Sequence, residues 1–186
     1  EALGHTFEVQ VPLRTPRGVK RPDYVFYRSV AARNANKGKT VGEMELGAAF
    51  AVGDAKHWER RLDVSAPASP GEHDEINRIP AEQIAYYMLH SGARWGVLTN
   101  GRRWRLYHKE SAQKQDRYYE VDLKDACAAD GVDAFLYFYA FFRRAAFETP
   151  ATAGEGPGAA DGDLTLAAML AESADYARGV SASLKS

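Results

Sequence analysis

Two acids and a lysine occupy the ends of two apolar runs in this chain. Asp23 begins one run, and Asp54 and Lys56 end another. Side chains of a strand alternate between its faces, so Asp54 and Lys56 point to one side and Ala55 to the other. Two carboxylates, with the Ala55 carbonyl as a further oxygen, form a minimal site for Mg²⁺. A lysine beside such a metal can hold or deprotonate a water, which suits phosphodiester hydrolysis.

A helix expected after the lysine adds two polar side chains. Pro80 suits the first turn of this helix, which we expect to run to Ser91. Gln83 and Tyr87 are four residues apart and therefore share one face of it. The alternative for the helix is that Gln83 faces water and Tyr87 packs in the core. The alternative for residues 54–56 is a charged strand end that is only solvated. The order of the motifs along the chain favours a common site.

These motifs, in this order, resemble those of the PD-(D/E)XK nuclease superfamily. The matching residues are Pro22-Asp23, Asp54-Ala55-Lys56 and the pair Gln83 and Tyr87 of a Gln-x-x-x-Tyr helix. Many members carry Glu where this chain has Asp54. Both are hard oxygen ligands, but their reach differs by one methylene.

A further segment narrows the resemblance. Asn100-Gly101 lies between two apolar runs and predicts a hairpin. With the stretch from Asp54 to Trp58 and the pair Leu62-Asp63, it is similar to the N-terminal nuclease region of type IIG restriction-modification enzymes. The similarity covers about residues 1–147.

The resemblance implies a restriction-endonuclease-like core, which is an α/β fold with a central mixed sheet flanked by helices. It implies a type II, Mg²⁺-dependent endonuclease acting on double-stranded DNA. In this role Asp23, Asp54 and the Ala55 carbonyl would bind the metal, and Lys56 would position the attacking water. Gln83 and Tyr87 would support the site from the helix.

The same resemblance implies further partners in the same polypeptide. An adenine-specific DNA methyltransferase and a target-recognition domain would follow downstream, with S-adenosylmethionine bound there. The alternative is a catalytically inactive nuclease-fold module that binds DNA or a partner protein. An RNA substrate is a third alternative.

Composition is ordinary for a soluble globular protein, with 45% hydrophobic and 26% charged residues among 186. The single cysteine, Cys127, excludes an internal disulfide and favours the cytoplasm. No apolar run approaches the roughly 20 residues of a membrane helix, so we expect no membrane association. The net charge of −1 argues against a uniformly basic DNA coat. The histidines lack zinc-type spacing, and no Walker-type phosphate loop is present.

Basic residues nevertheless gather in three clusters, and arginine suits phosphate through its planar fork of donors. Each cluster can be a solvated loop or hairpin tip, but we expect at least one to follow a phosphate backbone. The clusters are Arg14, Arg17, Lys20 and Arg21; Arg60 and Arg61; and Arg102, Arg103 and Arg105. We expect the three tryptophans to be core or rim residues rather than base-stacking groups: Trp58, Trp95 and Trp104.

Apolar alternation and turn residues predict the elements that position these groups. We expect strands at 7–13, 23–27, 47–56 and 118–121, loops at 34–45 and 65–80, and a second helix at 130–147. The predicted nuclease domain is 1–147, followed by a linker at 148–162. Residues 163–186 would begin a helical connector that Asp163 caps. Because the chain starts at Glu1 and its last residues resemble a helix, we expect it to be part of a longer protein.

Overall fold

The computed structural model describes residues 3–44, 48–58, 60–63, 79–110, 117–128, 132–148, 165, 166 and 168–170. The chain divides into two units. One comprises His5–Phe135 and the other comprises Glu1–Gly4 with Leu136–Ser186. All candidate site residues belong to the first, which we call the sheet unit.

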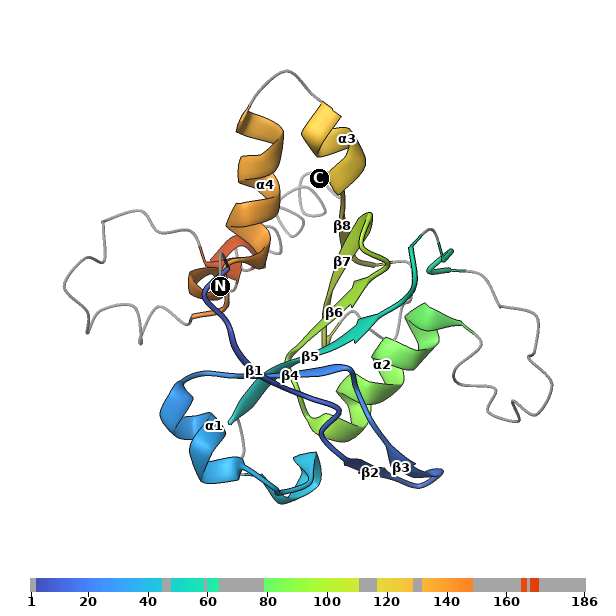
Figure 1. Cartoon of the computed structure of the whole chain (residues 1–186), viewed down its shortest axis with the longest axis vertical. Coiled ribbons are helices and arrows are strands. Elements are labelled where there is room, and N and C mark those ends of the chain that lie inside the picture. The colour runs from blue at the N-terminus through green and yellow to red at the C-terminus, as the bar shows by residue number, and fades with distance from the viewer. Residues whose placement is uncertain are drawn as a thin grey trace, which may run out of the picture. The chain divides into compact units, whose positions relative to one another are not determined.

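A six-stranded mixed sheet forms the centre of the sheet unit, with the strand order β1-β4-β5-β6-β7-β8 (Figure 1). β5 and β6 are parallel, and every other neighbouring pair is antiparallel. This confirms the expected mixed α/β fold. The strands are β1 (Thr6–Val9), β4 (Tyr24–Tyr27), β5 (Ala49–Ala55), β6 (Trp95–Thr99), β7 (Arg103–His108) and β8 (Tyr119–Asp122).

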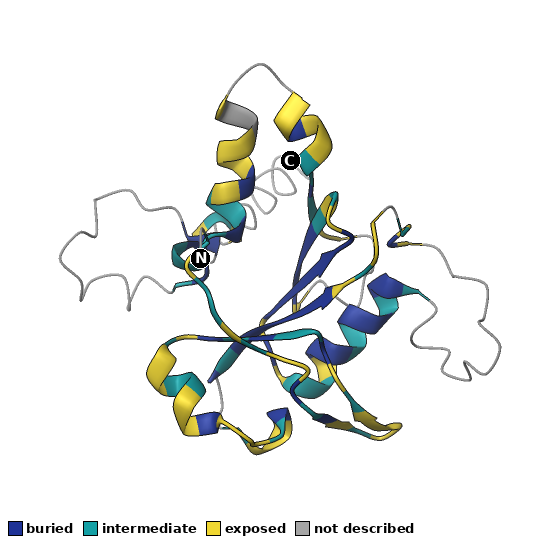
Figure 2. Ribbon diagram, in the orientation of Figure 1, coloured by how far each residue is buried: buried dark blue, intermediate teal, exposed yellow. Residues whose placement is uncertain are grey.

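Helix α2 (Pro80–Ser91) connects the two parallel strands and packs on them. It ends where Gly92 takes a left-handed φ of 69°, a conformation suited to glycine. Ile84 and Met88 of the helix are fully buried in one core with Val52 and Leu98 of the strands. Buried residues accordingly lie along β5, β6 and one side of α2 (Figure 2). The expected helix at 80–91 and the hairpin at Asn100-Gly101 are both confirmed.

The N-terminal part differs from expectation in two places. The strand expected at 7–13 is interrupted, because Gln10 has a φ of 54° and Pro12 has no N–H for a sheet. β2 (Leu13–Thr15) then pairs with β3 (Gly18–Lys20) as a separate two-stranded hairpin.

The loop expected at 34–45 was wrong in part. α1 (Val30–Asn36) occupies its start, and a 3₁₀ turn, η1 (Val41–Glu43), follows. The Ser29 side chain caps α1 by accepting a hydrogen bond of 3.0 Å from the Ala32 N–H.

The sheet unit also contains a helix that the sequence did not predict, α3 (Leu123–Ala128). Asp122 caps it by accepting hydrogen bonds from the N–H groups of Lys124 and Asp125, at 3.0 and 3.3 Å. The helix expected at 130–147 divides into α4 (Val132–Phe142) and a 3₁₀ turn, η3 (Arg144–Phe147).

The remaining predictions fall largely outside the described residues. These are the loop at 65–80, of which only its end is described, the linker at 148–162, and the connector at 163–186, of which only 165, 166 and 168–170 are described. No helix in the described ranges is long and apolar enough to cross a membrane.

Close contact between α2 and β6 depends on Gly96. A Cβ at this position would lie 2.4 Å from the Met88 sulfur and 3.0 Å from Ile84 Cγ1. We therefore expect Gly96→Ala to lower the free energy of unfolding by about 2 kcal/mol, as overpacked cores do. Urea titration measures this change.

The matched control is Gly42→Ala, since no atom lies within 4 Å of a Cβ there. It should leave stability within about 1 kcal/mol of the wild type. Equal stability of the two variants would contradict the packing argument.

Candidate active site

Asp54 and Lys56 lie together at the C-terminal end of β5. The Lys56 N–H extends the pairing with β6 by donating to the Thr99 carbonyl at 2.7 Å. This pairing keeps both side chains on the sheet face that α2 covers. The Lys56 ammonium lies 2.6 Å from an Asp54 carboxylate oxygen. Asp54 is only 3% exposed, so the ion pair is largely shielded from water.

Two side chains of α2 extend the polar contact between Asp54 and Lys56. Lys56 Nζ donates to Gln83 Oε1 at 2.6 Å, and Gln83 Nε2 donates to the Tyr87 hydroxyl at 2.7 Å. Gln83 and Tyr87 are both buried. Gln83 therefore does not face water. Tyr87 packs in the core and also accepts a hydrogen bond from Gln83. The result is a continuous polar chain from Asp54 through Lys56 and Gln83 to Tyr87.

Asp23 approaches the same place from the start of β4, which pairs with β5. One of its carboxylate oxygens accepts a hydrogen bond from the Ala55 N–H at 2.7 Å. The other accepts from Gln10 Nε2 at 2.6 Å. All five predicted side chains therefore gather at one end of the sheet, although they are spread over three elements.

The electrostatics of the site centre on Asp54. The pKa of Asp54 is raised from 3.8 to about 6, mainly by burial, and the charge and hydrogen bond of the neighbouring Asp23 contribute to this rise. The ammonium of Lys56 opposes this shift but does not cancel it. Among the described residues, the site thus places two carboxyl groups beside one cation, a balance that favours an added positive charge.

Gln10 is a site residue that the sequence analysis missed. It orients Asp23 through its side chain, and its own N–H donates to the Asp23 carbonyl at 3.2 Å. Its φ of 54° is uncommon for a residue with a side chain and costs of order 1 kcal/mol. Nothing in residue type signals this conformation, since glycine or asparagine would be expected there.

Asp23 and Asp54 are the two residues of the site that could hold a hard divalent cation. Within the described ranges, no group of three or more His, Cys, Asp or Glu residues could hold a metal ion. Two carboxylates are nevertheless the usual protein share for Mg²⁺, which completes its shell with water and substrate phosphate. The Ala55 carbonyl as a further ligand stays a prediction.

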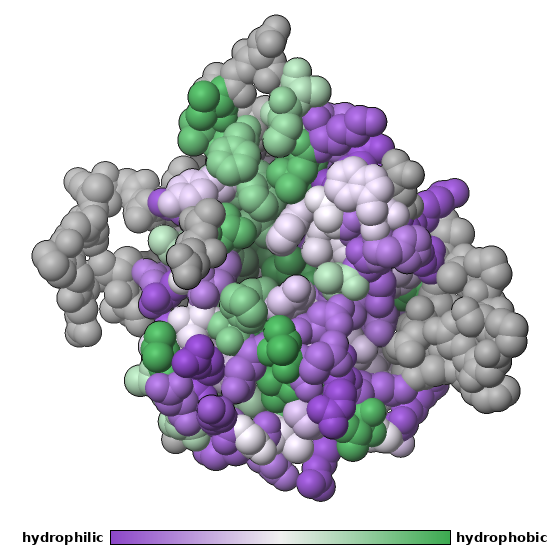
Figure 3. All heavy atoms as spheres, in the orientation of Figure 1, coloured by the Kyte–Doolittle hydropathy of each residue, from purple (hydrophilic) through white to green (hydrophobic). Residues whose placement is uncertain are grey.

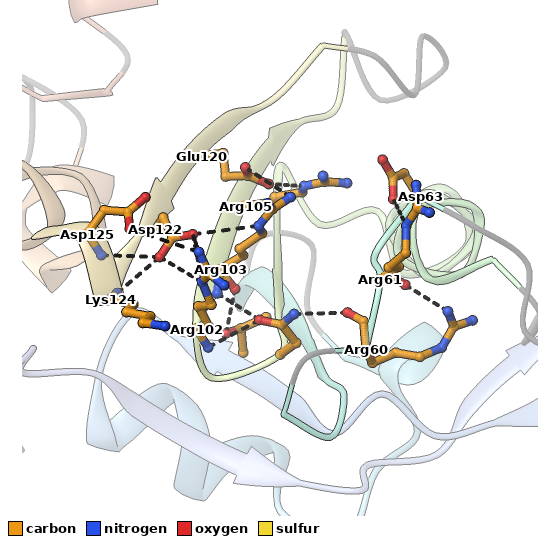
Figure 4. A network of polar contacts seen from close by, with 12 residues as sticks. Arg60, Arg61, Asp63, Arg102, Arg103, Arg105, Glu120, Asp122, Lys124 and Asp125 are labelled. Carbon is orange, nitrogen blue, oxygen red and sulfur yellow. Dashed lines mark hydrogen bonds and ion pairs between the residues drawn. The ribbon is translucent and has the colours of Figure 1, made fainter.

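The basic cluster on β7 is mainly engaged within the protein (Figure 4). Arg102 forms a two-pronged contact with Asp122, with its Nε and Nη2 each 2.8 Å from Oδ2. Arg105 is 2% exposed, donates to Glu120, and lies over the Tyr118 ring at 4.1 Å. The Arg105 side chain is therefore neither solvated at a hairpin tip nor accessible to a phosphate.

The β2–β3 hairpin and Arg21 directly after it form a basic cluster that is linked to the site. Arg21 donates to the Gln10 carbonyl at 3.0 Å, which links the hairpin to Asp23. Arg14 pairs with Glu43 at 3.3 Å, but its side chain remains 71% exposed. Hydrophilic residues cover most of this part of the surface (Figure 3). This cluster is thus both linked to the site and exposed to a phosphate backbone.

Comparisons with protein-family models, curated proteins and solved structures give no match. The geometry of the site and the motifs that carry the resemblance are therefore the grounds for assigning a function.

The raised pKa of Asp54 predicts a pH-dependent stability. Asp54 keeps its proton to a higher pH in the folded chain than in the unfolded chain. Its contribution to the free energy of unfolding is therefore fully present below about pH 3.8 and is lost as pH rises through about 6. Between about pH 4 and pH 7, the wild type should lose about 2–3 kcal/mol of unfolding free energy relative to Asp54→Asn. Urea titrations with a chelator present measure this difference.

The exposed acid Asp63 provides a control, since its side chain is 53% exposed. Asp63→Asn should follow the wild type at every pH. Parallel curves for the wild type and Asp54→Asn would show that Asp54 titrates normally.

Proposed function

We propose that the sheet unit is a Mg²⁺-dependent endonuclease domain with a restriction-endonuclease-like core. The observation that carries this proposal is the meeting of Asp23, Asp54 and Lys56, with the Lys56 ammonium 2.6 Å from the buried Asp54 carboxylate. A structural ion pair alone does not require a second acid beside it. Two acids and one amine do match what a metal-dependent phosphodiester hydrolase needs.

Asp23, Asp54 and the Ala55 carbonyl would hold the metal. When bound, Mg²⁺ supplies charge stabilisation to the phosphate and acidifies a coordinated water. Lys56 presents an ammonium to the same place, where it orients the attacking water and offsets negative charge that develops on the phosphate.

Gln83 and Tyr87 act through the lysine. The Gln83 amide accepts from Lys56 and donates to Tyr87, so its orientation is fixed at both ends. A lysine has many rotamers, and this contact selects one that keeps its amine beside Asp54. Gln10 orients Asp23 in the same way.

Double-stranded DNA is the proposed substrate, with the basic β2–β3 hairpin contacting its backbone. The resemblance supports a wider setting, a cytoplasmic type IIG-like restriction-modification protein. An adenine-specific methyltransferase that uses S-adenosylmethionine and a specificity domain would lie elsewhere in that polypeptide.

A nuclease-fold module without activity is the second candidate. The observation that favours it is the direct closure of Lys56 on Asp54, which satisfies both charges without a metal. The two candidates differ in metal binding and in cleavage.

Cleavage tests the role of Lys56. We expect the chain to nick supercoiled plasmid DNA with Mg²⁺, and Lys56→Ala to lower the rate by at least about 100-fold, because charge stabilisation at the reacting phosphate is lost. Gel electrophoresis of the nicked product measures the rate. Lys37→Ala, at an exposed position at the end of α1, is the control and should cut like the wild type. Equal rates for the wild type and Lys56→Ala would remove the assignment.

Metal binding separates the two candidates directly. Calorimetry with Mn²⁺ should give a binding signal for the wild type at neutral pH, where Asp54 is ionised. Asp54→Ala should abolish that signal, and Asp63→Ala should not change it. Absence of a signal in the wild type would favour the module without activity.

A further inference from the structure

Trp58 is exposed, unlike the other two tryptophans. Its exposed fraction is 58%, whereas Trp95 is buried at 5% and Trp104 is partly buried with its Nε1 donating to the Gly101 carbonyl. A tryptophan is on average a highly buried residue, so an indole left in water calls for an explanation. Trp58 follows the candidate catalytic lysine by two positions.

The indole is nevertheless held in place. A Cβ at Gly101 would lie 3.1 Å from Cε3 and 3.4 Å from Cζ3 of Trp58, so the ring rests on the bare backbone of the β6–β7 turn. Asn100 Nδ2 donates to the Arg60 carbonyl at 2.9 Å, which fastens the segment after Trp58 to the same turn. Trp58 thus offers a positioned flat surface rather than a freely moving side chain.

The indole and the candidate active site lie at the same end of the sheet. Lys56 pairs with Thr99 through its N–H, and the turn that supports Trp58 follows Thr99 directly. The residues that follow Trp58 in sequence are mostly charged, with Arg60 and Arg61 among them and the acids Glu59 and Asp63 beside them. The Arg61 side chain is 72% exposed and pairs with Asp63 at 3.9 Å.

We propose, contrary to the expectation from the sequence, that Trp58 stacks on a nucleobase that has left its pair in the duplex, next to the phosphate that the site would cleave. This inference deepens the proposed nuclease function and depends on it for the identity of the ligand. An aromatic platform with neighbouring cations is how proteins hold single-stranded nucleic acid, since every base has a flat face. An apolar protein partner would need apolar residues around the indole, whereas the residues that follow Trp58 in sequence are mostly charged.

Binding to a short oligothymidylate in the presence of a chelator tests the proposal without cleavage. Fluorescence anisotropy of a labelled strand gives the dissociation constant. Trp58→Ala should weaken binding about tenfold, and Trp58→Phe should recover most of the loss because its ring still stacks. Leu89→Ala removes another exposed apolar side chain, 63% exposed on α2, and should bind like the wild type.

A strand of the same length with abasic sites separates stacking from charge. The wild type and Trp58→Ala should bind it equally, because no base is present to stack. Equal binding of oligothymidylate by both proteins would overturn the proposal. The proposal would also be overturned if Trp58→Ala lost as much affinity for the abasic strand as for oligothymidylate. The same holds if the substitution weakened binding to blunt duplex DNA alone.

The two proposals fail in distinguishable ways. A chain that binds strands through Trp58 but never nicks plasmid would remove the nuclease proposal and the place of the base beside a cleaved phosphate, and would leave only the base contact. A chain that nicks plasmid but binds strands equally well with and without Trp58 would remove this inference and keep the nuclease proposal.

Discussion

The site is organised around a carboxylate that is almost completely removed from water. Burying a charge is costly unless a partner compensates it, and among the residues that the structure describes Asp54 has one ammonium within ion-pair distance, that of Lys56. Asp23 adds to the cost rather than relieving it, since a second acid opposes ionisation of the first. The fold therefore holds an arrangement that is unfavourable on electrostatic grounds alone, and the packed sheet must supply the stability that keeps it.

The helix across β5 and β6 supplies part of that stability and also sets the geometry. Gly96 lets Met88 and Ile84 pack directly against the β6 backbone. The same approach brings Gln83, one helical turn before Tyr87, within 2.6 Å of the lysine. The packing of α2 on the sheet thus also sets the position of Gln83 relative to Lys56. A change that moves the helix away from the sheet would also separate the amide from the amine.

Some of this architecture could be predicted from the sequence, because local patterns specify it. Proline at the first turn and Gly92 after the last residue bound the helix at 80–91. Asn100-Gly101 marks the hairpin, and alternation along the strand puts Asp54 and Lys56 on one face. The Gln83–Tyr87 spacing predicted a shared face, although only the structure supplies the contact with Lys56.

The rest depends on contacts between distant residues, which local patterns do not encode. Gln10 takes a left-handed conformation because it bridges Asp23 and Arg21, both more than ten residues away. In the sequence, Arg102 and the arginines of β7 resemble a phosphate-binding cluster, but β8 places Glu120 and Asp122 beside them in the structure. Helix α3 is only six residues long, and its start depends on Asp122, which also binds the guanidinium of Arg102.

That shared cap has a consequence for how the chain can vary. Asp122 accepts two N–H groups at the start of α3 while it receives the guanidinium of Arg102 beside the β6–β7 turn. Exchanging the two residues would preserve the opposite charges but not the helix start, since arginine has no acceptor atom to offer. Positions 102 and 122 are therefore not interchangeable partners, and any compensating substitution must keep an oxygen at 122.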